Sequence, residues 1–255
     1  MKAMISFLKK EWTQHLRTSK ILSIGLIFIF LGILGPATAK ATPAIMEMLS
    51  STQNSSISIT VGEVTALDSW VQFFKNIPMG LIAFILIESS IFTKEYQSGT
   101  LVLALTKGLD RYKVVLAKTL IMIFLWTTGY FACFGLTYAY SAFYWDNSIA
   151  ENLIFSVVIL WIFGLFAIAL TVLFSTLTKT NISVLIGTGG VIFALYLVGM
   201  FPKIDKFMPT MLMDGNSLIY GLKDSGDYNT AIAITVIAII VCLVASIPIF
   251  NKKHI

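Results

Sequence analysis

A short segment that combines charge, glycine and apolar side chains, residues 94–111, holds the residue types best suited to bind a partner. Glu95 can accept hydrogen bonds from a basic surface, and Arg111 can form a bidentate pair with a carboxylate. Gly99 permits a tight turn or a close approach of another backbone. The apolar run 101–105 is unfavourable in bare water. These residue types predict docking to a partner, although an ordinary loop beside a positive cluster would contain them too.

A second polar feature is Glu88, an acid inside an otherwise apolar stretch. Carboxylates within a membrane span are costly and usually face the helix bundle or water. One interpretation is a polar gate or a proton-linked site near the inner mouth of a pathway. The other, which we favour, pairs Glu88 with a neighbouring basic group or with Ser89 or Ser90.

The sequence contains no recognisable catalytic set, and we expect neither an enzyme nor a cofactor or metal site in this chain. His15 and His254 lie near opposite ends without metal-ligand neighbours. The phosphate-binding pattern Gly-x-x-x-x-Gly-Lys-Ser/Thr is missing, because the pair Gly-Lys does not occur. Cys133 and Cys242 fall in apolar stretches and are expected to be packed free thiols.

The composition predicts an all-α polytopic membrane protein. Of 255 residues, 57% are hydrophobic and 12% charged, whereas soluble domains carry about 25% charged residues. Six apolar stretches approach the ~20 residues that cross a bilayer. They are residues 21–39, 77–92, 114–143, 153–177, 182–201 and 231–250. The third is long and must tilt, kink or protrude.

Two segments outside these spans are also expected to be helical. Residues 1–20 repeat apolar side chains at helical spacing, with Trp12 among them, and predict an amphipathic helix in the inner interface. Residues 202–229 are rich in proline and glycine, and predict short re-entrant or interfacial helices on the outer side.

Two pairs of residues have capping-box spacing and suggest where helices begin. Ser69 and Gln72 predict a helix that starts at Trp70, before the second span. Ser148 and Glu151 predict a start just before the fourth span.

The charges predict the orientation. Six spans place both termini on one side, and thirteen basic against three acidic residues then lie there. The other side carries five basic and nine acidic residues. Because basic loops stay inside, both termini are predicted to be cytoplasmic. The sequence pI of about 9.1 therefore reflects topology, and we expect membrane lipid as a partner and no nucleic acid, which would need a continuous basic surface.

The order Glu95-x-x-x-Gly99-Thr100-Leu101, followed by Arg111 and Lys118, resembles a segment of ABC-2-type transporter permeases. The resemblance extends over most of the chain, from the amphipathic helix through six spans to the short outer helices before the last one. It implies that the cytoplasmic segment 94–111 contains a short coupling helix and links the spans to an ATPase. The coupling residues would be Glu95, Gly99, Thr100, Leu101, Leu103, Arg111 and Lys118. Relatives often have proline and serine before the arginine, whereas this chain reads Lys107-Gly108-Leu109-Asp110.

The resemblance implies the permease subunit of an ABC exporter in a bacterial plasma membrane. Two cytoplasmic ABC ATPase subunits would bind ATP and Mg, and a second permease half, identical or related, would complete the outward pathway. With almost no fixed intramembrane charge, the pathway suits a hydrophobic or amphipathic substrate, by family analogy an antimicrobial or cytolytic peptide. The alternatives are a non-transporting sensor or anchoring subunit and, third, a secondary transporter, which should show more intramembrane ionisable groups or an inverted repeat.

Overall fold

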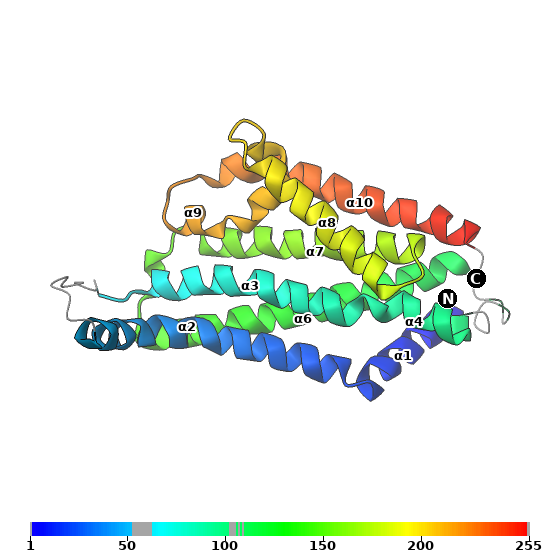
Figure 1. The fold of residues 1–255 in the computed structure, drawn as a ribbon, viewed down its shortest axis with the longest axis horizontal. Coiled ribbons are helices and arrows are strands. Elements are labelled where there is room, and N and C mark those ends of the chain that lie inside the picture. The colour runs from blue at the N-terminus through cyan, green and yellow to red at the C-terminus, as the bar shows by residue number, and fades with distance from the viewer. Residues whose placement is uncertain (1, 53–62, 102–105, 107, 109, 254–255) are drawn as a thin grey trace.

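Within residues 2–52, 63–101, 106, 108 and 110–253, which the computed structural model describes, all regular structure is helical (Figure 1). The α-helices are α1 (Lys2–Arg17), α2 (Lys20–Thr52), α3 (Ala66–Glu88), α4 (Ser90–Ser98), α6 (Arg111–Tyr144), α7 (Leu153–Leu177), α8 (Asn181–Gly199), α9 (Gly215–Ile219) and α10 (Asn229–Lys252). Four short 3-10 helices join them: η1 (Asn147–Ile149), η2 (Asp205–Phe207), η3 (Pro209–Met213) and η4 (Ser225–Tyr228).

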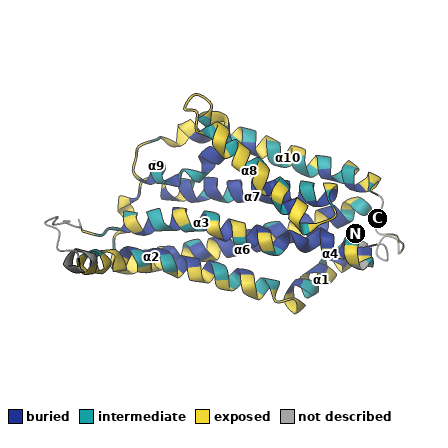
Figure 2. Cartoon of the chain, in the orientation of Figure 1, coloured by how far each residue is buried: buried dark blue, intermediate teal, exposed yellow. Residues whose placement is uncertain are grey.

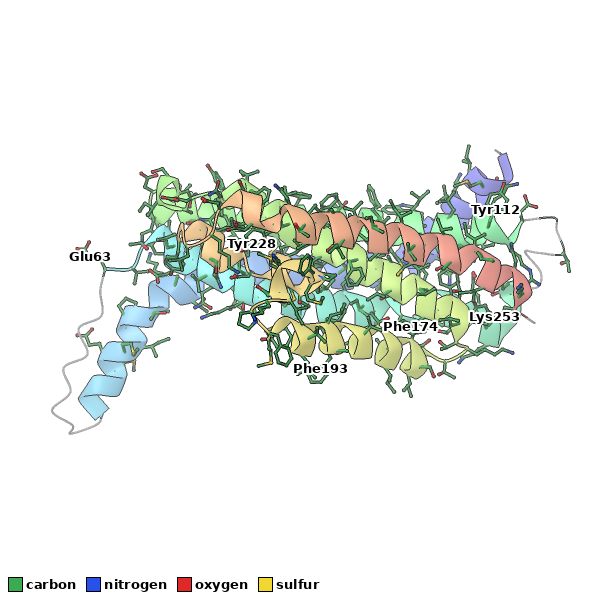
Figure 3. All side chains as sticks on the ribbon, turned by 90° about the horizontal axis from the view of Figure 1, so that it is seen from above. Glu63, Tyr112, Phe174, Phe193, Tyr228 and Lys253 are labelled. Carbon is green, nitrogen blue, oxygen red and sulfur yellow. The ribbon has the colours of Figure 1, made fainter. Side chains whose placement is uncertain are left out.

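Six of the described helical segments are long and apolar enough to cross a membrane. They are α2, α3 with its continuation α4, α6, α7, α8 and α10. The predicted all-α polytopic fold is therefore confirmed, and each predicted apolar stretch falls on one of these segments. Both marked chain ends lie at one end of the bundle, called here the terminal end (Figure 1). Tyr112 and Lys253 also lie there, opposite Glu63 (Figure 3).

Some helices are longer than the apolar stretches that predicted them. Helix α2 has 33 residues and spans about 50 Å at 1.5 Å per residue, whereas the hydrocarbon core is about 30 Å thick. Its last turns project away from the bundle (Figure 3). Helix α6, with 34 residues, is equally long. Both helices must therefore tilt or extend beyond the hydrocarbon.

The two predicted capping boxes are wrong. Helix α3 begins earlier, where the Asp68 carboxylate accepts a hydrogen bond from the Thr65 backbone N–H at 2.8 Å. Ser148 belongs to η1 and donates to Asp146 at 2.7 Å, while Asn152, with φ 48°, precedes α7. Capping-box spacing is common in sequences, so spacing alone does not locate a helix start.

The core lies where α2, α3, α6 and α7 pack side by side (Figures 1 and 2). Trp126 of α6 is fully buried and meets the ring of Phe28 edge-on at 5.6 Å. A Cβ added at Gly164 of α7 would overlap the Trp126 ring. The close approach of α6 and α7 therefore depends on this glycine. Cys133 and Cys242 are free thiols, as expected.

Helices α8 and α10 lie on the outside of the bundle and remain mostly uncovered (Figure 2). Helix α8 contacts the rest of the chain through Val184 and Thr188, which are buried, and through Gly187, which packs against Phe174. Large exposed apolar side chains line the remaining faces: Ile182, Ile186, Phe193, Ile237, Ile240 and Val244. Lipid or a second chain must cover them, because apolar surface of this extent is unfavourable in water.

The segment between α8 and α10 contains the short helices η2, η3, α9 and η4. Their predicted re-entrant or interfacial position stays a prediction. Asp214 organises the segment: its carboxylate accepts from Ser217 at 2.7 Å and pairs with Lys223 at 3.0 Å. Burial alone would raise the pKa of Asp214, but these contacts hold it below its usual value. The Tyr228 hydroxyl donates to the Asp214 carbonyl at 2.9 Å, which fixes the segment to the start of α10.

Candidate functional site

A cluster of four charged side chains, three of them buried and the fourth, Lys10, 45% exposed, lies at the terminal end of the bundle, where α1, α4 and α6 meet. It comprises Lys10 and Glu11 of α1, Glu95 of α4 and Lys118 of α6, and is called here the four-charge cluster. The Lys118 ammonium lies 3.0 Å from a carboxylate oxygen of Glu11 and 3.0 Å from one of Glu95. Lys10 contacts the other oxygen of Glu95 and lies 2.9 Å from Glu11. The two lysines and two carboxylates therefore alternate, and their formal charges cancel.

Local sequence explains how these side chains come to face one another. On α1, Phe7, Glu11 and His15 recur every four residues and form one buried face. Helix α4 starts after a break at Ser89 and ends at Gly99, whose φ of 67° is the left-handed conformation common after helix C-termini. This short helix places Glu95 toward α1 and α6.

Because three members of the four-charge cluster are buried, separating them would cost free energy, so the cluster holds α1, α4 and α6 together. The Lys118 and Glu11 side chains are each 1% exposed and that of Glu95 is 4% exposed. Charges so far from water are tolerated only when they are paired and hydrogen-bonded. Lys118 also donates to the Ile91 carbonyl at 2.8 Å. Removing one member of such a pair typically costs about 3–5 kcal/mol, because its partner is left buried and unpaired.

The same contacts shift the pKa values of Glu11 and Lys10 on α1 in the directions that favour their charged forms. Burial favours the neutral acid of Glu11, yet Lys118 and Lys10 lower its pKa below the usual value. Burial would likewise lower the pKa of Lys10, but its hydrogen bonds to Glu95 and Glu11 raise it. Both groups therefore stay charged at neutral pH.

A second polar contact extends from the four-charge cluster toward the middle of the bundle. Glu88, at the end of α3, is fully buried, and its oxygens lie 3.1 Å from His15 Nε2 and 3.4 Å from the Lys20 ammonium. His15 Nδ1 lies 2.8 Å from the Glu11 carbonyl, which can only accept. Nδ1 therefore donates to this carbonyl, and Nε2 faces a carboxylate oxygen of Glu88. The structure thus gives Glu88 the kind of basic neighbours that the favoured interpretation expects, and the alternative, a polar gate or proton-linked site, is untested.

The predicted coupling residues separate into internal and exposed positions. Glu95 and Lys118 belong to the four-charge cluster, and Leu101 is buried in the core. Thr100 is exposed, and Gly99 is partly buried. Leu103 lies outside the described residues.

Arg111 lies apart from the four-charge cluster and caps a helix. Its guanidinium donates to the carbonyl oxygens of Phe250 at 3.0 Å, Asn251 at 2.9 Å and Lys253 at 2.7 Å. These carbonyls lie at the C-terminal end of α10, where backbone acceptors lack intrahelical partners. Arg111 thereby fastens the start of α6 to the end of α10.

A similar contact joins α10 to α7. The Lys253 ammonium donates to the carbonyl oxygens of Thr176 at 3.0 Å and Thr178 at the end of α7, and it lies 4.0 Å from the centre of the Tyr96 ring. The Tyr96 hydroxyl donates to the Ser175 carbonyl at 3.2 Å. Neighbouring residues of α4 therefore reach different helices: Glu95 contacts α1 and α6, and Tyr96 contacts α7 and the end of α10.

Sequence reasoning missed Lys10, Glu11, His15 and Lys20 as parts of this site. A usable signal existed for two of them, because Glu11 and His15 share the helical face of Phe7. Charged residues on an apolar face require buried partners. Among the described residues, no group of three or more histidine, cysteine or acidic side chains is placed to hold a metal ion.

Six membrane-length helices with paired charges buried at one end define a polytopic α-helical membrane protein. A family profile described as an ABC-2 family transporter protein matches residues 5–255. The chain therefore belongs to the ABC-2 transporter family and is an ABC permease subunit, which associates with an ABC ATPase and a membrane partner. No individual characterised protein matched the sequence.

Proposed function

We propose that this chain is the permease half of an ABC exporter, and that α4 transmits the movement of a separate ATPase to the membrane helices. The observation that carries this proposal is the position of α4. Its Glu95 contacts α1 and α6, while its Tyr96 contacts the ends of α7 and α10. A displacement of this one short helix therefore acts on four others.

The four-charge cluster makes that transmission stiff. Sliding α4 past α6 would separate Glu95 from Lys118, whose side chains are both buried, at a cost of several kcal/mol. Moving α1, α4 and α6 together keeps every pair intact. Packed interfaces of this kind favour movement between discrete arrangements over continuous deformation.

The side chains that would touch the ATPase are the exposed ones near α4. Glu95 and Leu101 are buried inside the chain, whereas Lys94, Gln97 and Thr100 are exposed. Glu95, Arg111 and Lys118 then act as positioning residues that hold this segment against the bundle. ATP and Mg would be bound by two copies of the ATPase.

The proposed pathway lies between two permease halves, either two copies of this chain or this chain and a related one. Trp126 and Tyr130 are fully buried and fill the interior of a single chain. The exposed apolar faces of α8 and α10 fit a hydrophobic or amphipathic substrate, of which an antimicrobial or cytolytic peptide is one class.

The proposal places the terminal end in the cytoplasm of a bacterial cell, as the distribution of basic residues predicts. Single cysteines at Lys179 and Asp224, in a chain without its two native cysteines, test this orientation. A membrane-impermeant maleimide should label the Asp224 position in intact cells and the Lys179 position only after lysis. Labelling of the Lys179 position in intact cells would reverse the orientation.

Photo-crosslinking in native membranes tests the partner. A photoreactive amino acid at Gln97 or Thr100 should give a cross-linked product that mass spectrometry identifies as an ABC ATPase. The same amino acid at Asp224, which is also exposed, serves as the control and should not capture it. If neither terminal-end position captures an ATPase, α4 is not the coupling element.

A further inference from the structure

Helix α1 has three faces with different surroundings. Phe7, Glu11 and His15 face the bundle and are buried. Ile5 and Trp12 are exposed apolar side chains, 61% and 38% accessible. At about 100° per residue, Lys9 falls between this apolar face and a polar face. The helix therefore has one side buried against the bundle, one exposed apolar side and one exposed polar side.

The apolar face of α1 forms one wall of a groove whose other wall is α6. The groove has a volume of about 810 Å³, and Ile5, Trp12, Leu120 and Phe124 line it together with Lys9. The rings of Trp12 and Phe124 meet edge-on at 5.6 Å. The groove is open to the surroundings and its lining is mostly apolar, which suits a hydrocarbon chain.

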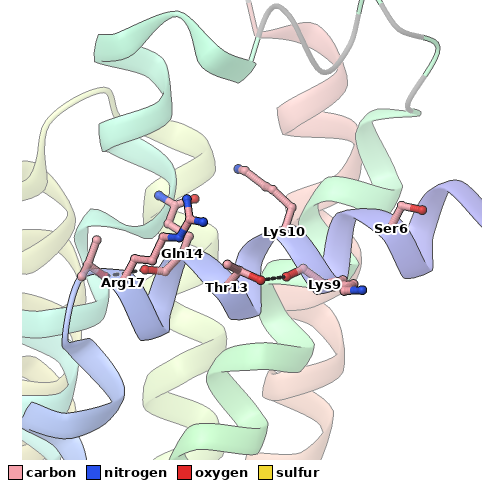
Figure 4. Close-up of a pocket in the computed structure, with 7 residues that line it drawn as sticks. Ser6, Lys9, Lys10, Thr13, Gln14 and Arg17 are labelled. Atoms are coloured by element: carbon pink, nitrogen blue, oxygen red, sulfur yellow. Dashed lines mark hydrogen bonds between the residues drawn. The ribbon is translucent and has the colours of Figure 1, made fainter.

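The polar face of α1 borders a second hollow, of about 620 Å³, shown in Figure 4. Ser6, Lys9, Lys10, Thr13 and Arg17 are among the residues that line it. Lys9 lines both the hollow and the groove. One cation thus stands where the apolar groove opens to water.

Lys9 differs from its neighbour Lys10 in the partners of its ammonium group. Lys10 pairs with Glu11 and Glu95, whereas no ion pair or hydrogen bond of the Lys9 side chain occurs within the described part of the chain. The Thr13 hydroxyl donates to the backbone carbonyl of Lys9 at 2.8 Å and does not involve its side chain. The Lys9 ammonium is therefore available for an external anion.

We propose that α1 and α6 bind an anionic phospholipid, with an acyl chain in the groove and the phosphate at Lys9. Charge complementarity and the continuity of groove and hollow through Lys9 support this occupant. A lipid headgroup with net negative charge is attracted by the adjacent cations and binds more tightly. Zwitterionic phosphatidylcholine carries a choline that compensates its phosphate, so this electrostatic attraction is weaker. The bound lipid would brace α1 against α6 beside the four-charge cluster.

Trp12 provides the probe, because it lines the groove and bromine atoms on acyl chains quench tryptophan fluorescence. The full chain is reconstituted in nanodiscs of phosphatidylglycerol and phosphatidylcholine in equal amounts, with bromine on only one of the two lipids. The contribution of Trp12 is the difference between the wild type and Trp12→Phe. The ratio of the two quenching values gives the enrichment of phosphatidylglycerol at the groove.

We expect an enrichment of about fivefold at about 0.1 M salt, since one lysine near a membrane surface contributes about that factor. It should approach one at about 1 M salt, where the Debye length falls to about 3 Å. Lys9→Gln should abolish the enrichment and Lys9→Arg should retain it. Lys252→Gln, an exposed lysine at the same end, should leave it unchanged.

Equal quenching by the two brominated lipids in the wild type would overturn the proposal, and that measurement needs no Lys9 variant. Enrichment that Lys9→Gln leaves intact would also overturn it. A loss as large in Lys252→Gln would reveal a general effect of surface charge instead of a site. None of these results depends on an ATPase or on transport, so they are independent of the proposed function.

Discussion

Replacing Lys118 by methionine tests whether the four-charge cluster holds α1, α4 and α6 together. Methionine preserves an unbranched chain but removes the ammonium that lies 3.0 Å from both Glu11 and Glu95. Two carboxylates, 1% and 4% exposed, would then share Lys10 alone. Losing one partner of a buried pair costs about 3–5 kcal/mol. Because Lys10 remains, we expect the lower end, about 3 kcal/mol, which corresponds to about a hundredfold change in a local opening equilibrium.

Backbone hydrogen exchange, measured by mass spectrometry in nanodiscs, reports such local opening directly. Peptides from α1 and α4 should exchange about a hundredfold faster in Lys118→Met, while peptides from α8 should be unchanged. Lys113→Met is the matched control, because Lys113 is on the same helix and its ion-pair partner, Asp110, is exposed. It should change little.

The double variant Lys118→Met with Glu95→Gln sharpens the test. Removing the stranded carboxylate as well leaves Glu11 with Lys10, so α4 should be better protected than in Lys118→Met alone. In the complex with its ATPase, Lys118→Met should hydrolyse ATP without transport. Unchanged exchange in Lys118→Met, or additive effects in the double variant, would refute a coupled buried cluster.

Three further results are expected. Arg111→Gln should fray the last turn of α10, because hydrogen bonds from a charged donor contribute about 1.5–3 kcal/mol. Backbone hydrogen exchange in that turn should become faster while expression stays normal. Unchanged exchange at the end of α10 would contradict the capping role. Gly164→Ala should lower the unfolding temperature in detergent, since overpacking against Trp126 costs about 1–3 kcal/mol, whereas Gly189→Ala, where a Cβ meets nothing within 4 Å, should not. Burial, and to a lesser extent the charge of Lys179, lower the pKa of Lys253 from 10.5 to about 8. The contribution of Lys253 to folding stability should therefore rise with pH between those two values. Chemical labelling of its amine should have a midpoint near pH 8, and a midpoint near 10.5 would contradict this environment.

The sequence by itself determined the fold class and the approximate position of every membrane-length helix. Runs of apolar residues near the length needed to cross a bilayer leave helix as the form that satisfies the backbone in lipid. The apolar spacing of residues 2–17 likewise predicted α1, and proline and glycine after α8 predicted short helices there. These are local properties, so they can be read without knowing what packs against them.

Only the tertiary structure decided what the charged residues do. Glu11 and Lys118 are 107 positions apart, and Lys10 and Glu95 are 85 apart. Their pairing depends on how three helices cross, which no local pattern encodes. Arg111 looked suited to a carboxylate, but the fold places it at the end of α10, where three backbone carbonyls lack helical partners. A charged side chain buried by packing takes whichever partner the fold brings within reach, because leaving it unpaired is too costly.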